Sequence, residues 1–315
     1  MQHAENLLCD LGEEVFAAEY QNDPSEKHPS SYDLTAGLVA ARVFTSRMRF
    51  TVPHEARVLT AATDLNHYGL HSVAVAFCND QTAAVSWYGR HDNDGQGIIE
   101  RNTPEGEAKR RMFEALVKHG RELAALPFAR DGQSVRPALW VSDGGYMHDV
   151  AQRYAEGPGR ALGFSVMVAR GYSADRYRPS GPHVIGKPRE QVHFTESTMG
   201  RFLAFNADHW REVSQRAWLG TPGAPGGLSL FDGQRHSEFA EQVCREKLVE
   251  KLQGQFGPVW RWHVQPGWHD YGDALTMAYV AAAWGGIGTA GGLPAVRLPA
   301  TRRRPRGERV SVIQI

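Results

Sequence analysis

Apolar runs with a strand period fill the first half of the chain, and one long helical period follows them. The runs VLTAATDL (58–65), HSVAVAF (71–77) and TAAVSWYG (82–89) are rich in β-branched and small apolar residues and are separated by turn residues. They predict three sequential antiparallel strands. The stretch PEGEAKRRMFEALVKHGRELAAL (104–126) places Met112, Leu116 and Leu123 on one stripe behind a proline that suits a first helical turn. This stripe predicts a helix that covers one face of the sheet.

The second half alternates strands and helices. PALWVSD (137–143) is typical of a buried strand, HDVAQRYAE (148–156) of a helix and FSVMVARG (164–171) of the next strand, which together predict a β-α-β unit. A hairpin of QVHFTES and GRFLAFN follows, and then the helix HWREVSQRAWL and the strand LSLF. The run HSEFAEQVCREKLVEKL predicts a helix or a helix-to-strand transition, PVWRWHVQP predicts another strand, and HDYGDALTMAYVAAAW predicts a final helix. The pattern predicts an α/β fold with a mixed central sheet and helices on both faces.

The ends of the chain have a different character. Residues 1–50 predict a lead-in segment, which includes a helix near Leu34 to Phe44, and residues 51–285 predict the main domain. Residues 286–315 contain GGIGTAGGLP and ATRRRPRGERV, and we expect a Gly-rich linker and a basic tail there.

Composition narrows the class of protein. Lys+Arg and Asp+Glu are equal at 35 each, so any surface that binds a polyanion must be local. The three cysteines, Cys9, Cys78 and Cys244, lie far apart without a CxxC pair, and the 14 histidines show no zinc-site spacing, which argues against a disulfide framework and a structural zinc site. No apolar run has the length to cross a bilayer, and the first residues carry acids. We expect a cytoplasmic protein without a membrane partner.

Three aspartates stand at the ends of apolar stretches. Asp64 ends the first strand, Asp143 lies at the carboxyl end of its strand, and Asp273 lies in the first turn of the last helix. Each alone is typical of a turn former or helix cap. A fold that brings the three together forms a pocket of repelling carboxylates, which bound dications relieve. Two Mg²⁺ or Mn²⁺ ions about 3.5–4 Å apart would then support in-line hydrolysis of a phosphodiester bond.

The order strand–Asp, strand–Asp, helix–Asp resembles the ribonuclease-H-like nuclease domain of the large terminase subunits of tailed bacteriophages. The segments that carry the resemblance include AAEYQNDP, VLTAATDLNHYGLHSVAVAF, WVSDGGYMHDVAQRYAE and HDYGDALTMAYVAA, and together they extend over roughly residues 15–285. The resemblance implies a ribonuclease-H-like sheet and metal-dependent endonucleolytic cleavage of double-stranded DNA during viral genome packaging.

The same resemblance implies the roles of individual residues. Asp64, Asp143 and Asp273 would be the catalytic and metal-binding residues, with two Mg²⁺ or Mn²⁺ ions as cofactors. Asp270 would be a further metal ligand, and His269 would act around the ions or position the attacking water.

The chain departs from the family in one respect, because it lacks the sequence motif of the packaging ATPase. A large terminase has a packaging ATPase with a phosphate loop, and this chain contains no GxxxxGK[ST]. We therefore expect an isolated nuclease portion, preceded in residues 1–50 by a segment from the ATPase side. Its expected partners, in the host cell cytoplasm, are double-stranded DNA and the ATPase, portal and small-subunit components of a packaging motor.

A basic segment between two predicted strands is the best candidate for DNA contact. It combines prolines and glycines with tyrosines and with four basic residues: Arg176, Arg178, Lys187 and Arg189. Such a loop can follow a phosphate backbone.

Two alternatives stay open. Another ribonuclease-H-like DNA enzyme, such as a transposase, an integrase or a junction resolvase, shares the carboxylate chemistry, and fold alone does not separate these enzymes. The segment AAEYQNDP and the lack of a zinc or helix-turn-helix module favour a terminase. In the other alternative the chain is a catalytically inactive docking module of a packaging assembly, and the acids are turn residues.

Overall fold

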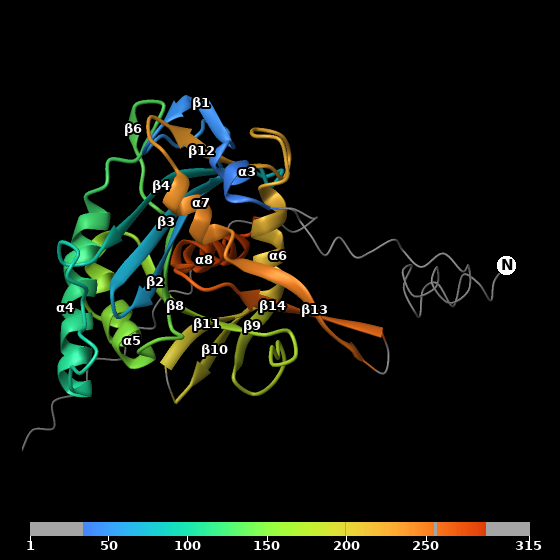
Figure 1. Cartoon of the computed structure of the whole chain (residues 1–315). Helices are drawn as coiled ribbons and strands as arrows, with labels where there is room; N and C mark the ends of the chain where they lie inside the picture. The colour runs from blue at the N-terminus through green and yellow to red at the C-terminus, as the bar shows by residue number, and fades with distance from the viewer. Residues whose placement is uncertain (1–33, 199, 255–256, 288–315) are drawn as a thin grey trace, which may run out of the picture.

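A mixed β-sheet is the centre of the computed structural model, which describes residues 34–198, 200–254 and 257–287 (Figure 1). Within these residues the sheet has ten strands: β1 (Val43–Met48), β2 (Val58–Asn66), β3 (Gly69–Phe77), β4 (Ala83–His91), β7 (Leu139–Asp143), β8 (Ser165–Tyr172), β9 (Val184–Arg189), β10 (Val192–Ser197), β11 (Gly200–Asn206) and β12 (Leu228–Asp232). Their spatial order is β1-β12-β4-β3-β2-β7-β8-β11-β10-β9.

The middle of the sheet defines the fold class. Strands β2, β3 and β4 form an antiparallel meander, β7 then pairs parallel with β2, and β8 pairs parallel with β7. Read across the sheet, the third, second, first, fourth and fifth of these strands are neighbours, which is the ribonuclease-H-like arrangement. The predicted α/β fold with a mixed ribonuclease-H-like sheet is confirmed.

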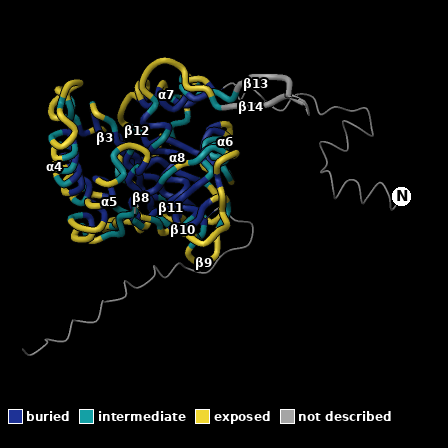
Figure 2. Tube along the Cα trace, turned by 90° about the horizontal axis from the view of Figure 1, so that it is seen from below, coloured by how far each residue is buried: buried dark blue, intermediate teal, exposed yellow. Residues whose placement is uncertain are grey.

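Helices cover both faces of this sheet. They are α3 (Ala36–Ala40), α4 (Glu105–Ala124), α5 (His148–Glu156), the 3₁₀ helix η1 (Pro158–Leu162), α6 (Ala207–Ala217), α7 (Ser237–Val243) and α8 (Asp270–Trp284). Helices α4 and α5 pack on one face, and α8 packs on the other with α6 and α7 around it (Figure 1). Figure 2 shows that the buried residues follow the strands and α8, whereas the outer helices and the loops carry the exposed ones.

Two further antiparallel pairs of strands lie outside the large sheet. One consists of β5 (Ala129–Arg130) and β6 (Gln133–Ser134), and the other of β13 (Glu246–Gly254) and β14 (Gly257–Val264). The second pair leads directly into α8.

Helix α8 is buried around nearly its whole circumference, as its apolar sequence requires. Its many alanines allow a close approach to the sheet, and the Thr60 hydroxyl donates a hydrogen bond to the Ala278 carbonyl (2.9 Å). The ring of Phe77 meets the ring of Tyr279 edge-on, with centroids 4.8 Å apart. The helix runs antiparallel to β2, because Asn66 at the end of β2 contacts Asp270 at the start of α8. The packing thus fixes the first turn of α8 at the carboxyl ends of the central strands.

The segment before residue 51 differs in part from the expectation. The predicted helix from Leu34 to Phe44 is wrong beyond Ala40, because β1 begins at Val43 and pairs in parallel with β12. The expected lead-in before residue 34 and the expected basic tail lie outside the described residues, so the domain boundaries stay a prediction. None of the helices in the described ranges has the length and apolar character needed to cross a bilayer.

The packing of α8 leads to a prediction about stability. Leu275 is 1% exposed in the core, whereas Leu219 is 38% exposed after α6. We expect Leu275→Ala to lower the free energy of unfolding by about 2–5 kcal/mol, because it removes buried methyl groups and leaves a cavity. Leu219→Ala should change it by less than about 0.5 kcal/mol. Urea unfolding followed by circular dichroism measures both, and equal losses would contradict the packing described for α8.

Candidate active site

The carboxyl ends of β2 and β7 bring the first two aspartates to one edge of the sheet. The two strands pair in parallel with Thr63 opposite Ser142, so Asp64 and Asp143 occupy the next position on each strand. Both side chains are half-buried. Side chains alternate between the faces of a strand, so Asp64 shares the face of Thr60, which contacts α8. The two residues therefore meet the first turn of α8.

Asp143 is held by the turn that follows its strand. Its two carboxylate oxygens accept hydrogen bonds from the backbone amides of Gly145 (2.8 Å) and Tyr146 (3.1 Å). A side chain at Gly144 would collide with Val168, because its Cβ would lie 2.6 Å from a methyl carbon. The carboxylate does form a turn, yet each oxygen keeps a further lone pair for a ligand.

The two aspartates of α8 do not cap their helix. The side-chain oxygen of Gln242 accepts from the Tyr271 amide (3.2 Å). Asp270 is 1% exposed and accepts hydrogen bonds from the Tyr68 hydroxyl (2.7 and 2.5 Å) and from the Asn66 amide (3.0 Å). These contacts tie the start of α8 to the turn after β2.

Asp273 carries the positive partners of the cluster. It forms ion pairs with Arg211 (3.2 Å) and His269 (3.2 Å), and Arg211 also pairs with Glu246 (2.7 Å). Burial alone would raise the pKa of Asp273, but the hydrogen bonds from His269 and Arg211 and the positive charge of Arg211 outweigh it and lower that pKa. Asp273 in turn raises the pKa of His269 to about 9, so this imidazole is protonated at neutral pH.

The pKa values of Asp64 and Asp143 shift in the opposite direction from that of Asp273. Burial raises the pKa of Asp64 well above its ordinary value, and the charges of Asp143, Asp273 and Asp270 raise it further. A hydrogen bond with Asp270 adds to this rise. Burial also raises the pKa of Asp143 to about 6, although its backbone hydrogen bonds oppose this. Among the ion pairs of the described residues, none joins a cation to Asp64 or Asp143. The structure thus brings all four aspartates into one electrostatic cluster with excess negative charge.

The cluster has the donors that a hard dication prefers. Carboxylate oxygens suit Mg²⁺ and Mn²⁺, whereas sulfur and imidazole suit softer ions. Among the described residues, no three of these aspartates present oxygens that all lie within 4.8 Å of one another, so a shared ion requires rotation of the side chains. The four aspartates fit a divalent cation by charge and by donor type.

Several contacting residues were not predicted from the sequence: Asn66, Tyr68, Arg211 and Glu246. Arg211 and Glu246 lie in the charged runs HWREVSQR and CREKLVEK, which are typical of solvated helix faces. Burial raises the pKa of Glu246 to about 7, and Arg211 opposes this rise. No sequence signal distinguishes these two residues from surface charges.

An aromatic and basic group lies beside the carboxylates. Trp268, which is 46% exposed, stacks on Tyr68 with ring centroids 5.0 Å apart. The guanidinium of Arg90 lies 5.0 Å from the centre of the Trp268 ring. This group is a cationic and aromatic surface next to the residue that holds Asp270.

The basic residues predicted for DNA contact follow β8 and continue into β9. Strand β9 is separated from β7 by three strands, which corresponds to about 19 Å at the usual spacing. Arg189 donates a hydrogen bond to the Trp284 carbonyl, and Arg178 donates to the Tyr177 carbonyl (2.9 Å), whereas Arg176 and Lys187 are exposed. Lys187 and Arg189 therefore lie several strands from β7, and the role of all four residues in DNA contact stays a prediction.

Comparisons with known proteins identify similar folds. No family model and no curated protein matches the chain. Among solved structures, the nuclease domain of the large terminase subunit gp2 of bacterial virus Sf6 is similar over 78% of this chain and 96% of that one, with a TM-score of 0.42 and 9% identity. A mutant of the same domain with manganese is similar over 71% and 88%, with a TM-score of 0.39 and 10% identity.

A second kind of protein is similar over a smaller part. An exopolyphosphatase from Cytophaga hutchinsonii is similar over 36% of this chain and 34% of its own, with a TM-score of 0.21 and 16% identity. The structures that are similar over most of this chain are terminase nuclease domains, and identities of 9–10% carry no residue roles over to this chain.

The charge repulsion predicts how the metal-free protein responds to pH. Because the pKa of Asp64 is raised by folding, its ionised form destabilises the folded state, and this penalty grows as the pH rises above about 4, the ordinary aspartate pKa. In a chelator, Asp64→Asn should raise the melting temperature at pH 8 by roughly 2–4 °C for each kcal/mol of repulsion removed. The gain should shrink as the pH falls from 8 to 5.

Asp94→Asn, in an exposed loop, is the matched control and should leave the melting temperature unchanged at every pH. Differential scanning fluorimetry measures the three proteins. An identical melting temperature for Asp64→Asn and the native protein at pH 8 would contradict the repulsion.

Because Arg211 pairs with both Glu246 and Asp273, we expect mutations of Arg211 and Glu246 to have strongly coupled effects on stability. Arg211→Met leaves the mostly buried Glu246 carboxylate without its cation, and we expect a loss of about 3–5 kcal/mol in the free energy of unfolding. Adding Glu246→Gln should restore part of this loss, because the amide needs no counter-charge. Urea unfolding of the two single variants and the double variant measures the coupling, and strictly additive losses would show that the two groups do not interact.

Proposed function

We propose that this chain is a metal-dependent nuclease that hydrolyses phosphodiester bonds of DNA. The observation that carries the proposal is the excess of negative charge around Asp64, whose pKa is raised by burial and then by Asp143, Asp273 and Asp270. A buried group of this kind is costly to a fold unless it binds cations. Perturbed carboxylates at strand ends are also typical of catalytic sites.

Asp64 is the proposed shared ligand of two ions. Asp143 approaches it from β7, and Asp270 and Asp273 approach it from α8, so carboxylates lie on more than one side of it. Mg²⁺ or Mn²⁺ ions held there would supply an activated water and would stabilise negative charge on the phosphate and on the leaving oxygen.

The remaining residues position these groups. Tyr68 and Asn66 orient Asp270, and the amides after β7 orient Asp143. Arg211 holds Asp273 in place. His269 contacts Asp273 (3.2 Å) and is a proposed donor to a phosphate oxygen or to the attacking water.

The finer parts of the proposal come from the sequence resemblance. They are cleavage of double-stranded DNA during viral genome packaging, in the host cytoplasm, together with an ATPase, a portal and a small subunit. Solved structures of the Sf6 domain include one with manganese and one with calcium, which accords with the use of divalent ions proposed for this chain.

Plasmid nicking tests the proposed activity. In 1–10 mM MnCl₂, a concentration on the order of that used to saturate weak carboxylate sites, the native protein should convert supercoiled plasmid to open circles, and EDTA should stop the reaction. Asp64→Ala should lower the rate at least about 100-fold, since removal of a shared ligand removes several kcal/mol of charge stabilisation. Asp94→Asn is the control and should keep the native rate.

Equal nicking by the native protein and Asp64→Ala would refute the assignment of the site. A native protein that binds DNA but cuts none with Mg²⁺ or Mn²⁺ would favour the docking module. Joined strand products from a DNA end substrate would favour a transposase or integrase over a terminase nuclease.

A further inference from the structure

Three potential metal ligands converge on the face of the sheet opposite to α8. They are His91 at the end of β4 and His119 and Glu122, one turn apart on α4. One ligand atom from each lies within 4.8 Å of the others, and among the described residues no other group of three His, Cys, Asp or Glu side chains has this property. His91 pairs across the sheet with Leu70, which packs in the apolar cluster beneath α4. The group is therefore separate from the aspartates around Asp64.

The distances match a tetrahedral ion. The Nδ1 atoms of His91 and His119 lie 3.1 and 3.7 Å from the same oxygen of Glu122, Oε2. Two ligands that are each about 2.0–2.1 Å from a tetrahedral zinc ion lie about 3.3 Å apart. Only a modest adjustment of the side chains is needed to surround an ion of this size.

One proposed ligand atom is buried without a hydrogen bond. Nδ1 of His119 is inaccessible to solvent and makes no hydrogen bond within the described structure, and its only polar contact is the longer ion pair with Glu122. The two histidines are 4% and 7% exposed. A buried polar atom without a partner is costly and calls for a ligand or another explanation.

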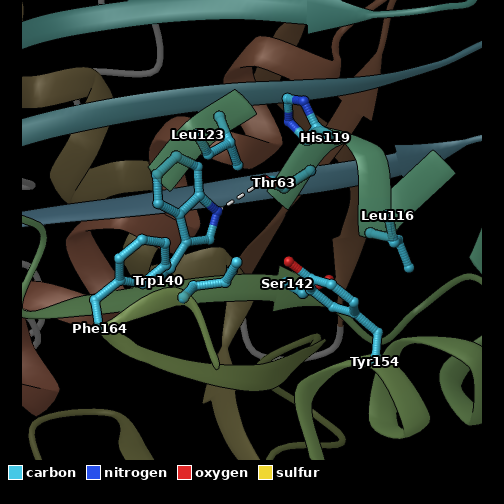
Figure 3. A pocket seen from close by; sticks show the side chains of 9 residues that line it. Thr63, Leu116, His119, Leu123, Trp140, Ser142, Tyr154 and Phe164 are labelled. Atoms are coloured by element: carbon cyan, nitrogen blue, oxygen red, sulfur yellow. Dashed lines mark hydrogen bonds between the residues drawn. The ribbon is translucent and has the colours of Figure 1, made fainter. Parts of the chain in front are cut away.

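A chain of hydrogen bonds orients one of the imidazoles. Nε2 of His119 contacts the Ser72 hydroxyl (2.8 Å), Ser72 contacts the Thr63 hydroxyl (2.7 Å), and Trp140 donates to Thr63 (2.8 Å). Figure 3 shows Trp140, Thr63 and His119 around a small pocket beneath α4, with the bond from Trp140 to Thr63 dashed. The contact of Nε2 with Ser72 leaves Nδ1 as the free ligand atom, which is how metal-binding histidines are usually held.

We propose that His91, His119 and Glu122 bind one zinc ion or a similar transition-metal ion. Two imidazoles and one carboxylate favour zinc over Mg²⁺, which prefers oxygen ligands alone. The Glu122 side chain is 49% exposed, so the open side of the group faces solvent and a water molecule can complete the coordination. The ion would fasten the end of β4 to α4. This site goes beyond the proposed nuclease activity and against the sequence expectation of no structural zinc site.

Zinc binding by the full chain tests the proposal. The protein is freed of any histidine tag and carries Asp64→Asn and Asp143→Asn, so that the carboxylate cluster contributes little. Competition with a chromophoric zinc chelator should show one zinc ion per chain. Zinc should also raise the melting temperature, because it binds the folded state.

Glu122→Gln and His119→Gln separate the site from other histidines. Each should weaken zinc binding at least about 10-fold and abolish the rise in melting temperature. His183→Gln, at an exposed position, should bind as the parent does. Glu122 is half-exposed, so its variant is expected to fold, and circular dichroism checks this.

Two outcomes would overturn the proposal. One is a parent protein that binds no zinc, and the other is a folded Glu122→Gln variant that binds zinc as tightly as the parent. Both outcomes are independent of nuclease activity, because the test protein lacks two of the proposed catalytic carboxylates.

Discussion

Repulsion among carboxylates at the ends of β2 and β7 and the start of α8 is the constraint on which the rest of this structure depends. Asp64 lies among three other aspartates that all raise its pKa. The fold supplies two cationic groups, Arg211 and His269, and directs both to Asp273. A cluster that served only stability would be expected to pair each carboxylate with a cationic side chain. Here the negative charge around Asp64 has no such partner, so a bound cation is most favourable there.

The fold holds this unfavourable group together through the burial of α8. An apolar helix buried around most of its surface has few alternative positions, because interiors are close-packed and any shift opens a cavity. The bond from Thr60 to the Ala278 carbonyl and the contacts of Asn66 and Tyr68 with Asp270 fix the helix along β2. The apolar core thus provides the stability that the charge cluster removes, and it sets the positions of Asp270 and Asp273.

Local sequence signals were sufficient for the central strands and for the positions of the main carboxylates. Asp64 and Asp143 end strands that are marked by their own apolar runs, and the parallel pairing of those strands then places them side by side. These local patterns did not predict which strands from distant parts of the chain pair with each other. β1 pairs with β12, almost 190 positions further along the chain, and this tertiary contact decides its conformation. The ribonuclease-H-like strand order itself was anticipated through resemblance, since periodicity does not give strand order.

The residues of the site were predicted less completely than the fold, because their contacts also join distant parts of the chain. Arg211 and Glu246 look like solvated charges along the chain, and only the fold makes Arg211 a partner of both Glu246 and Asp273. The basic residues between β8 and β10 illustrate the limit of composition. Their composition suits a phosphate backbone, but it does not show that three strands separate β7 from β9, which carries Lys187 and Arg189.

Adjacent residues of one strand belong to both polar groups of this protein. Thr63 faces α4 and joins the hydrogen bonds that end at His119, whereas Asp64 faces α8 and the other aspartates. The strand period of two therefore sends neighbouring side chains to opposite faces of the sheet. One face offers carboxylates for hard ions, and the other offers imidazoles for softer ones. A sheet buried on both sides keeps these two sets of donors apart, so that each can be selective for a different ion although the strand positions that serve them are consecutive.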